Sequence, residues 1–207
     1  MISWEKFNDI LQWIVKIAYL NVLWIVFTAA GLGIFGLFPA TGALFTIVHK
    51  WYNREPVNGI LKTFAKTFLN EFIPLNKYGI LFLIFGYMLV YDLLFIQMND
   101  ERLKFLYPII VFIGIIYIVT LLYFFPTYLR FDLKFFQYIK QSFFIGASSI
   151  VETMIILMAI MILTIIIRFI PGILPVYSGS VIALVITWCS NRAIERIKLK
   201  KENDHTS

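Results

Sequence analysis

Two carboxylates interrupt long apolar stretches, and they are the residues whose type and position could do chemistry. Asp92 lies in the apolar segment 78–97 and Glu152 in the apolar segment 145–167. A charged side chain at membrane depth is costly, so it normally faces a partner or a polar cavity. Two acids facing one cavity could relay protons, as a small proton-coupled secondary transporter requires. The alternative is an ion pair for each acid: Asp92 with Arg102 or Arg168, and Glu152 with Lys140 or Lys77.

The other polar side chains suit packing better than chemistry. Asn21 is flanked by Leu20 and Trp24, and we expect it to hydrogen-bond across helices. His49 and His205 are isolated in the chain, which argues against a metal site because such a site needs several ligands. The lone Cys189 is typical of a small packing residue. We therefore expect no catalytic residue, no metal and no cofactor.

Several enzyme signatures are missing from the sequence. It contains no GxxxxGK[ST] phosphate loop, no HExxH and no GxSxG, and these patterns mark nucleotide hydrolysis, zinc proteolysis and serine hydrolysis. Residues 53–77 also lack a convincing match to the cytoplasmic coupling segment of ABC permeases. We expect a protein that is neither an enzyme nor a standard permease subunit.

Composition places the chain in a membrane. Hydrophobic residues make up 60% of its 207 positions and the mean hydropathy is +0.84. No charged residue occurs between Lys16 and Lys50, whereas a soluble helix keeps a polar face. The net charge of +6 is then a signal of membrane topology before it suggests a nucleic-acid partner, and we expect no such partner.

The uncharged stretch after Lys16 admits two interpretations. In the first, segments 13–31 and 34–51 form a helical hairpin that turns at 31–33. In the second, one span ends near Phe38, and Pro39 opens a short helix at the membrane surface. Small residues at spacings of 4, 3 and 4 predict a smooth strip for close helix packing, made of Ala29, Gly33, Gly36 and Ala40.

Two basic segments have the periodicity of helices that lie in the membrane interface. Segment 53–77 places Lys62 and Lys66 opposite a face of phenylalanines, and segment 130–143 repeats this pattern with Lys134. With Lys140, these lysines suit anionic lipid headgroups. The spans that remain are 78–97, 105–128, 145–167 and 173–190. The predicted fold is an all-α polytopic membrane protein with five to six transmembrane helices and two interfacial amphipathic helices.

The distribution of basic residues predicts the orientation. If segments 1–16, 50–77, 130–140 and 192–201 share one side of the membrane, that side holds 15 of the 18 basic residues and should be cytoplasmic. The count favours six spans with both termini inside, while five spans would place the N-terminus outside. We expect one membrane domain over 1–201, with a cytoplasmic C-terminus and a disordered polar tail over 202–207.

The sequence resembles the YesL family, bacterial integral membrane proteins of about this length without an assigned biochemical function. The likeness is strong over residues 15–80 and looser afterwards. It departs at His49 and Lys50, where such proteins tend to show an arginine near Trp51. The residues that carry it are Ala18-Tyr19-Leu20-Asn21, Leu23-Trp24, Gly31-Leu32, Gly36-Leu37-Phe38-Pro39-Ala40-Thr41, Ala43-Leu44-Phe45, Lys50-Trp51, Phe125-Pro126 and Arg130-Phe131-Asp132.

The resemblance implies a bacterial cell membrane and genes that are often neighbours of carbohydrate ABC-transporter genes. It transfers no catalytic or binding residue, since none is established for the family. Our first hypothesis is therefore an accessory or regulatory component of carbohydrate uptake that contacts an ABC permease or forms a homo-oligomer. The second is a small proton-coupled transporter that uses the intramembrane acids.

Overall fold

The computed structural model describes the backbone over residues 4–98 and 101–206, and every regular element in these ranges is helical. The predicted all-α membrane protein is thus confirmed in its general form. Among the described residues, four helical segments are long and apolar enough to cross a membrane: Asn8–Ala30, Phe72–Met98, Lys104–Arg130 and Ile150–Phe169. The elements are α1 (Trp4–Ala30), α2 (Ile34–Tyr52), α3 (Ile60–Asn70), α4 (Phe72–Met98), the 3-10 helix η1 (Glu101–Leu106), α5 (Tyr107–Arg130), α6 (Phe135–Ser148), α7 (Ile150–Phe169), the 3-10 helix η2 (Pro171–Ile173) and α8 (Leu174–Thr206).

The first two helices form a hairpin whose turn depends on glycine. The chain reverses between Ala30 and Ile34, and Gly33 precedes α2 with a φ of 72°, a conformation that favours glycine. A Cβ added to Gly36 would lie 2.3 Å from the carbonyl oxygen of Thr28, so only glycine permits this approach of α2 to α1. The interpretation in which Pro39 opens a separate surface helix is wrong, because Pro39 lies inside α2.

The turn also divides the predicted strip of small residues. Ala29 is exposed on α1 and Gly33 lies in the turn, whereas Gly36 and Ala40 are buried on α2. The four residues therefore do not share one helix face. The close approach that the strip was expected to provide is made by Gly36 together with Gly31, where an added Cβ would lie 2.4 Å from the Gly36 Cα.

Helix α2 lies at the centre of the packing and contacts α1, α3, α4, α5 and α8. Aromatic rings fill much of the space around it: Phe45 stacks on Phe125 with ring centroids 5.2 Å apart, and Phe38 stacks on Phe82 at 6.1 Å. Such pairs hold helices together in a membrane, where apolar burial alone gives little preference for protein over lipid.

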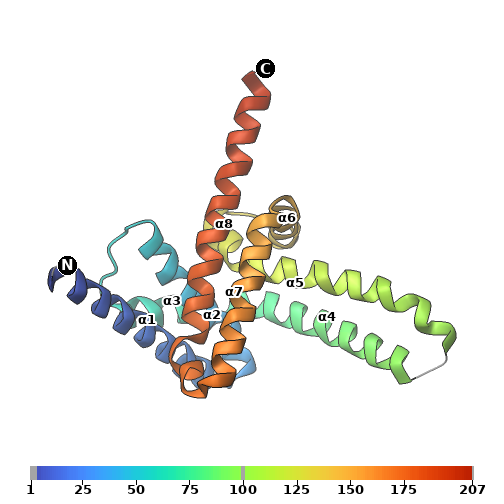
Figure 1. Ribbon diagram of the computed structural model, residues 1–207, viewed down its shortest axis with the longest axis horizontal. Coiled ribbons are helices and arrows are strands. Elements are labelled where there is room, and N and C mark those ends of the chain that lie inside the picture. The colour runs from blue at the N-terminus through green and yellow to red at the C-terminus, as the bar shows by residue number, and fades with distance from the viewer. Residues whose placement is uncertain (1–3, 99–100, 207) are drawn as a thin grey trace.

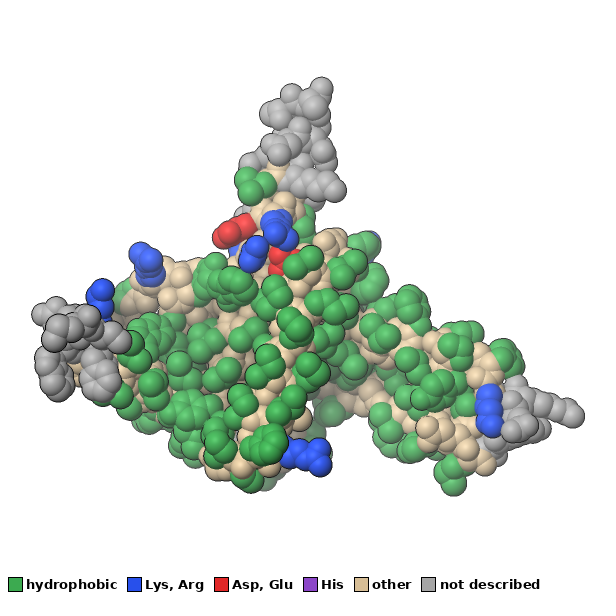
Figure 2. All heavy atoms as spheres, in the orientation of Figure 1, with side chains coloured by type: hydrophobic (Ala, Val, Ile, Leu, Met, Phe, Trp, Pro, Cys, Tyr) green, Lys and Arg blue, Asp and Glu red, His purple; other side chains and the backbone are tan. Residues whose placement is uncertain are grey.

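Helices α4 and α5 form a second hairpin that projects from the body of the protein (Figure 1). The hydroxyl of Tyr117 donates to the carbonyl oxygen of Phe82 at 2.9 Å and ties the two helices together. Apart from this seam, many of their large apolar side chains are exposed, most of them on α4. Figure 2 shows apolar side chains covering this hairpin and most of the visible face.

The two short helices α3 and α6 have one buried and one exposed side. In α3, Phe64 and Phe68 are buried while Lys62 and Lys66 are exposed. In α6 the buried side is formed by Tyr138, Ser142, Ile145 and Gly146. Lys134 at the start of α6 and Lys140 within it are exposed. These are the lysines predicted to face lipid headgroups, and that prediction stays a prediction. The disorder expected for the polar tail over 202–207 also stays a prediction. In the structure α8 continues to Thr206.

Candidate functional site

An ion pair between α7 and α8 holds the more buried of the two predicted acids. Glu152, the third residue of α7, is 2% exposed. Its Oε1 accepts a hydrogen bond from Arg196 Nη1 at 2.8 Å, and Arg192 Nε lies 3.8 Å away. The two arginines are four residues apart on α8, so they lie on the same face of that helix. A single carboxylate therefore faces two guanidinium groups.

The predicted partners of Glu152 were wrong. A lysine was expected, either Lys140 or Lys77, whereas in the structure the arginines that lie next to Glu152 come from α8. The reason is the antiparallel packing of α7 against α8, which aligns the start of the first with the basic part of the second. Arginine also suits this role better than lysine, because its planar group donates several hydrogen bonds to a carboxylate.

Polar side chains from α5 and α8 surround this ion pair. Arg130 Nη1 at the end of α5 donates to Asn191 Oδ1 at 2.5 Å. At Thr153, the residue after Glu152, the hydroxyls of Tyr123 and Thr153 lie 3.0 Å apart and are buried. The ends of α5 and α7 and the middle of α8 thus form one polar layer, in which helix ends are tied together by side chains.

The second predicted acid lies elsewhere. Asp92 is exposed on α4, in the projecting hairpin, and no side chain that the structure describes forms an ion pair or hydrogen bond with it. Arg168 lies in the last turn of α7. The side chain of Arg102, the other expected partner, lies outside the described residues. The two acids therefore do not share a cavity, and the arrangement does not form a relay between them.

Asn21 joins helices at opposite ends of the chain. It is fully buried on α1, and its Oδ1 accepts hydrogen bonds from the backbone nitrogen of Ser180 at 3.0 Å and from the Ser180 hydroxyl at 3.4 Å. Beside it, Trp24 Nε1 donates to Thr41 Oγ1 at 3.0 Å and links α1 to α2. The expected interhelical hydrogen bond of Asn21 is present, and its geometry is that of a packing contact.

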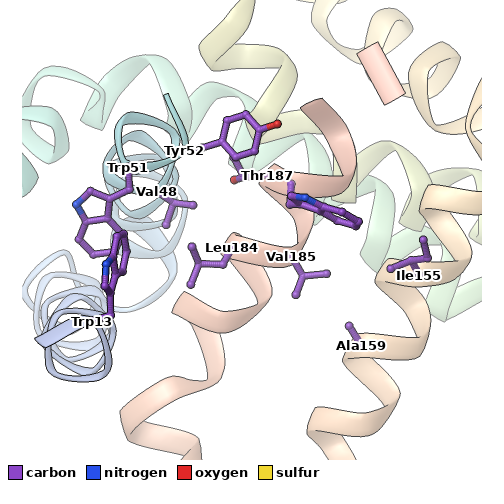
Figure 3. A pocket seen from close by; sticks show the side chains of 10 residues that line it. Trp13, Val48, Trp51, Tyr52, Ile155, Ala159, Leu184, Val185 and Thr187 are labelled. Carbon is purple, nitrogen blue, oxygen red and sulfur yellow. The ribbon is translucent and has the colours of Figure 1, made fainter. Parts of the chain in front are cut away.

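A groove of about 500 Å³ runs across α1, α2, α7 and α8. Figure 3 shows Trp13 and Trp51 together at one side, Leu184 and Val185 on α8 in the middle, and Ile155 and Ala159 on α7 at the other side. Sequence reasoning missed this groove, as it missed Arg192 and Arg196. The tryptophans come from separate helices and only their packing brings them together, whereas the spacing of the two arginines was visible in the sequence.

These features define a helical multi-pass membrane protein in which a buried ion pair joins two of the helices. Comparison with known proteins identifies the family. Residues 17–93 match the family described as a protein of unknown function, DUF624. The chain belongs to this family, which we refer to as the YesL family after one of its relatives.

Three relatives come from Bacillus subtilis strain 168, and each is described as an uncharacterized protein. YteU is 33% identical over 191 residues, which is 92% of this chain and 84% of YteU. YesL is 30% identical over 197 residues, 95% of this chain and 93% of YesL. YesV is 28% identical over 184 residues, 88% of each chain. No solved structure matches the chain.

Proposed function

We propose that this chain is an accessory or regulatory protein of the bacterial cell membrane that acts by contacting another membrane protein. The observation that carries the proposal is the α4–α5 hairpin, which projects from the body with many of its large apolar side chains exposed, most of them on α4. In this proposal α2 and the apolar half of α8 are the fifth and sixth spans, and α3 and α6 lie at the membrane surface. The lysines of α3 and α6 then face anionic lipid headgroups.

Asp92 supports a specific kind of partner. A carboxylate on the surface of a membrane helix is costly when it has no counter-charge, and none of the described side chains supplies one. A transmembrane helix with a lysine or arginine at the same depth would supply it. On the same helix, Tyr87, Tyr91 and Phe95 stack in sequence with centroids 6.3 Å and 6.2 Å apart. Exposed aromatic side chains of this kind are common anchors of protein contacts.

A carbohydrate ABC permease is the partner that we propose, because the family resemblance associates such proteins with sugar-uptake genes. A second copy of the chain is the other candidate. The basic part of α8 is then cytoplasmic, since basic residues accumulate on that side. The proposal assigns the chain no catalytic step.

The proton-coupled transporter receives less support. A relay needs acids that can take up and release protons within one pathway, but Glu152 is held by two arginines at the α7–α8 contact. Asp92 lies on the separate hairpin. The two groups therefore suit an ion pair and a contact surface better than a shared pathway.

Site-specific photo-crosslinking in the native host tests the proposal. A photoreactive amino acid at Tyr91 should capture one protein whose membrane segment carries a lysine or arginine. The same amino acid at Ile162, which is exposed on α7, is the matched control and should not. Asp92→Lys should abolish the crosslink, and reversing the partner's basic residue to aspartate should restore it. Equal crosslinking from both positions, or no effect of the reversal, would contradict the proposal.

A further inference from the structure

The groove across α1, α2, α7 and α8 has an apolar floor. Its middle is formed by Leu184 and Val185 of α8, and Ile155 and Ala159 of α7 continue it. Its volume of about 500 Å³ lies within the range of pockets that hold small molecules, roughly 300–1,000 Å³. These residues belong to apolar helices, so the groove opens toward lipid and an acyl chain is its natural occupant.

One end of the groove is aromatic. Trp13 and Trp51 meet edge to face with their ring centroids 5.3 Å apart, and Tyr52 lies beside Trp51 in the chain, while Trp188 lines the groove from α8. Tryptophan and tyrosine concentrate where the hydrocarbon meets the polar headgroups, because their rings are apolar and their N–H or O–H groups are polar. The aromatic end therefore marks the depth at which a lipid headgroup would lie.

Two cations stand over these tryptophans. Lys16 Nζ lies 5.8 Å from the Trp13 ring, and the Arg192 guanidinium lies 5.5 Å from the Trp188 ring. Arg192 is only loosely engaged by Glu152, because Arg196 makes the closer contact with that carboxylate. Glu195, exposed on α8 between the two arginines, is a second acid in this region. Lys16, Arg192 and Arg196 against Glu152 and Glu195 leave a surplus of one positive charge along the tryptophan-lined part of the groove.

Thr187 provides a hydrogen bond that the protein leaves unused. It lines the groove, it is 2% exposed, and its hydroxyl is buried with no hydrogen-bond partner among the residues that the structure describes. A buried hydroxyl in this position is normally satisfied. An ester or phosphate oxygen of a lipid in the groove would accept its hydrogen once the side chains that cover the hydroxyl move aside.

We propose that this groove is a specific site for an anionic glycerophospholipid. One acyl chain lies along Leu184 and Val185, and the phosphate lies among the tryptophans, where Lys16 beside Trp13 and Arg192 beside Trp188 attract it. The apolar floor selects a lipid over free phosphate. The surplus positive charge selects a lipid of net negative charge, such as phosphatidylglycerol, over the zwitterionic phosphatidylethanolamine.

Native mass spectrometry of the purified full chain, with each of these two lipids added at equal concentration, tests the site. The wild type should retain phosphatidylglycerol in preference. Arg192→Gln and Lys16→Gln should each weaken its retention about fivefold, the effect expected for one cation near a headgroup. Lys62→Gln removes the same charge from α3, away from the groove, and should leave retention unchanged.

A second variant separates the groove from general surface charge. Ala159→Leu fills the floor without changing any charge, and it should reduce retention of both lipids while the circular dichroism spectrum stays that of the wild type. Equal retention of the two lipids by the wild type would mean ordinary boundary lipid and would overturn the proposal. So would unchanged retention in the Lys16→Gln protein, since Lys16 is exposed and its loss should leave the fold intact. A change in oligomer size with Ala159→Leu, without lipid loss, would assign the groove to a second copy instead.

Discussion

Arg196 and Glu152 form an ion pair in which the arginine side chain is 54% exposed and the glutamate side chain is 2% exposed. The two members of this pair are therefore unequal. If the carboxylate is removed, both arginines can turn toward the polar surroundings. If the arginine is removed, the carboxylate stays buried with only Arg192 nearby at 3.8 Å.

This inequality predicts the order of two substitutions. Arg196→Gln should lower the free energy of unfolding by about 1–3 kcal/mol, because a buried charged acceptor loses its closest donor. Glu152→Gln should cost less, and the double variant should be more stable than Arg196→Gln alone. Thermal unfolding in detergent measures all three. Arg168→Gln, in the last turn of α7, is the control. A larger loss from Glu152→Gln than from Arg196→Gln would contradict the account of the pair.

The close packing of α2 against α1 should depend on the absence of a side chain at Gly36. Gly36→Ala places a methyl group against the Thr28 backbone, and such overpacking typically costs about 1–3 kcal/mol. Gly114→Ala on α5 is the matched control, since nothing lies within 4 Å of the added carbon. The control should be neutral or stabilising by roughly 0.5–1 kcal/mol, the usual difference between glycine and alanine in a helix. Similar melting temperatures for the two variants would show that the α1–α2 approach is not tight.

Asn21 should contribute to stability and not to ligand binding. Replacing it with alanine removes the hydrogen bonds that join α1 to Ser180 of α8, and an interhelical hydrogen bond of this kind is worth about 1 kcal/mol. We expect Asn21→Ala to lower the melting temperature, and Asn70→Ala, exposed at the end of α3, to leave it unchanged. Equal effects would indicate that Asn21 is not an important interhelical contact.

Cysteine labelling tests the predicted topology. In a Cys189→Ser background, single cysteines at Asn8, Asn58 and Leu199 should react with an impermeant reagent only after the membrane is opened. A cysteine at Lys104 should react in intact cells, because the predicted topology places Lys104 outside, on the side of the membrane that holds few basic residues. All four positions are exposed. Labelling of Asn8 in intact cells would instead support five spans with the N-terminus outside.

The sequence by itself determined that this is a helical membrane protein. A membrane constrains the chain locally: the uncharged stretch between Lys16 and Lys50 is visible without knowing what packs against what. The hairpin turn at Gly31–Gly33 was one of two interpretations of that stretch, whereas the two Phe-rich basic helices were readable because helical periodicity acts over a few residues. Their bounds were not: α3 covers only Ile60–Asn70 of the expected segment 53–77, and α6 covers Phe135–Ser148 where 130–143 was expected.

Only the tertiary structure decided which side chains meet. Glu152 pairs with arginines 40 and 44 positions away instead of the expected lysines, and Asn21 reaches Ser180 across 159 positions. The groove needs tryptophans from three helices, and the separation of Asp92 from Glu152 follows from the outward course of α4. These contacts depend on how whole helices pack. In a membrane that packing is decided by shape and by a few polar contacts, which local hydropathy does not encode.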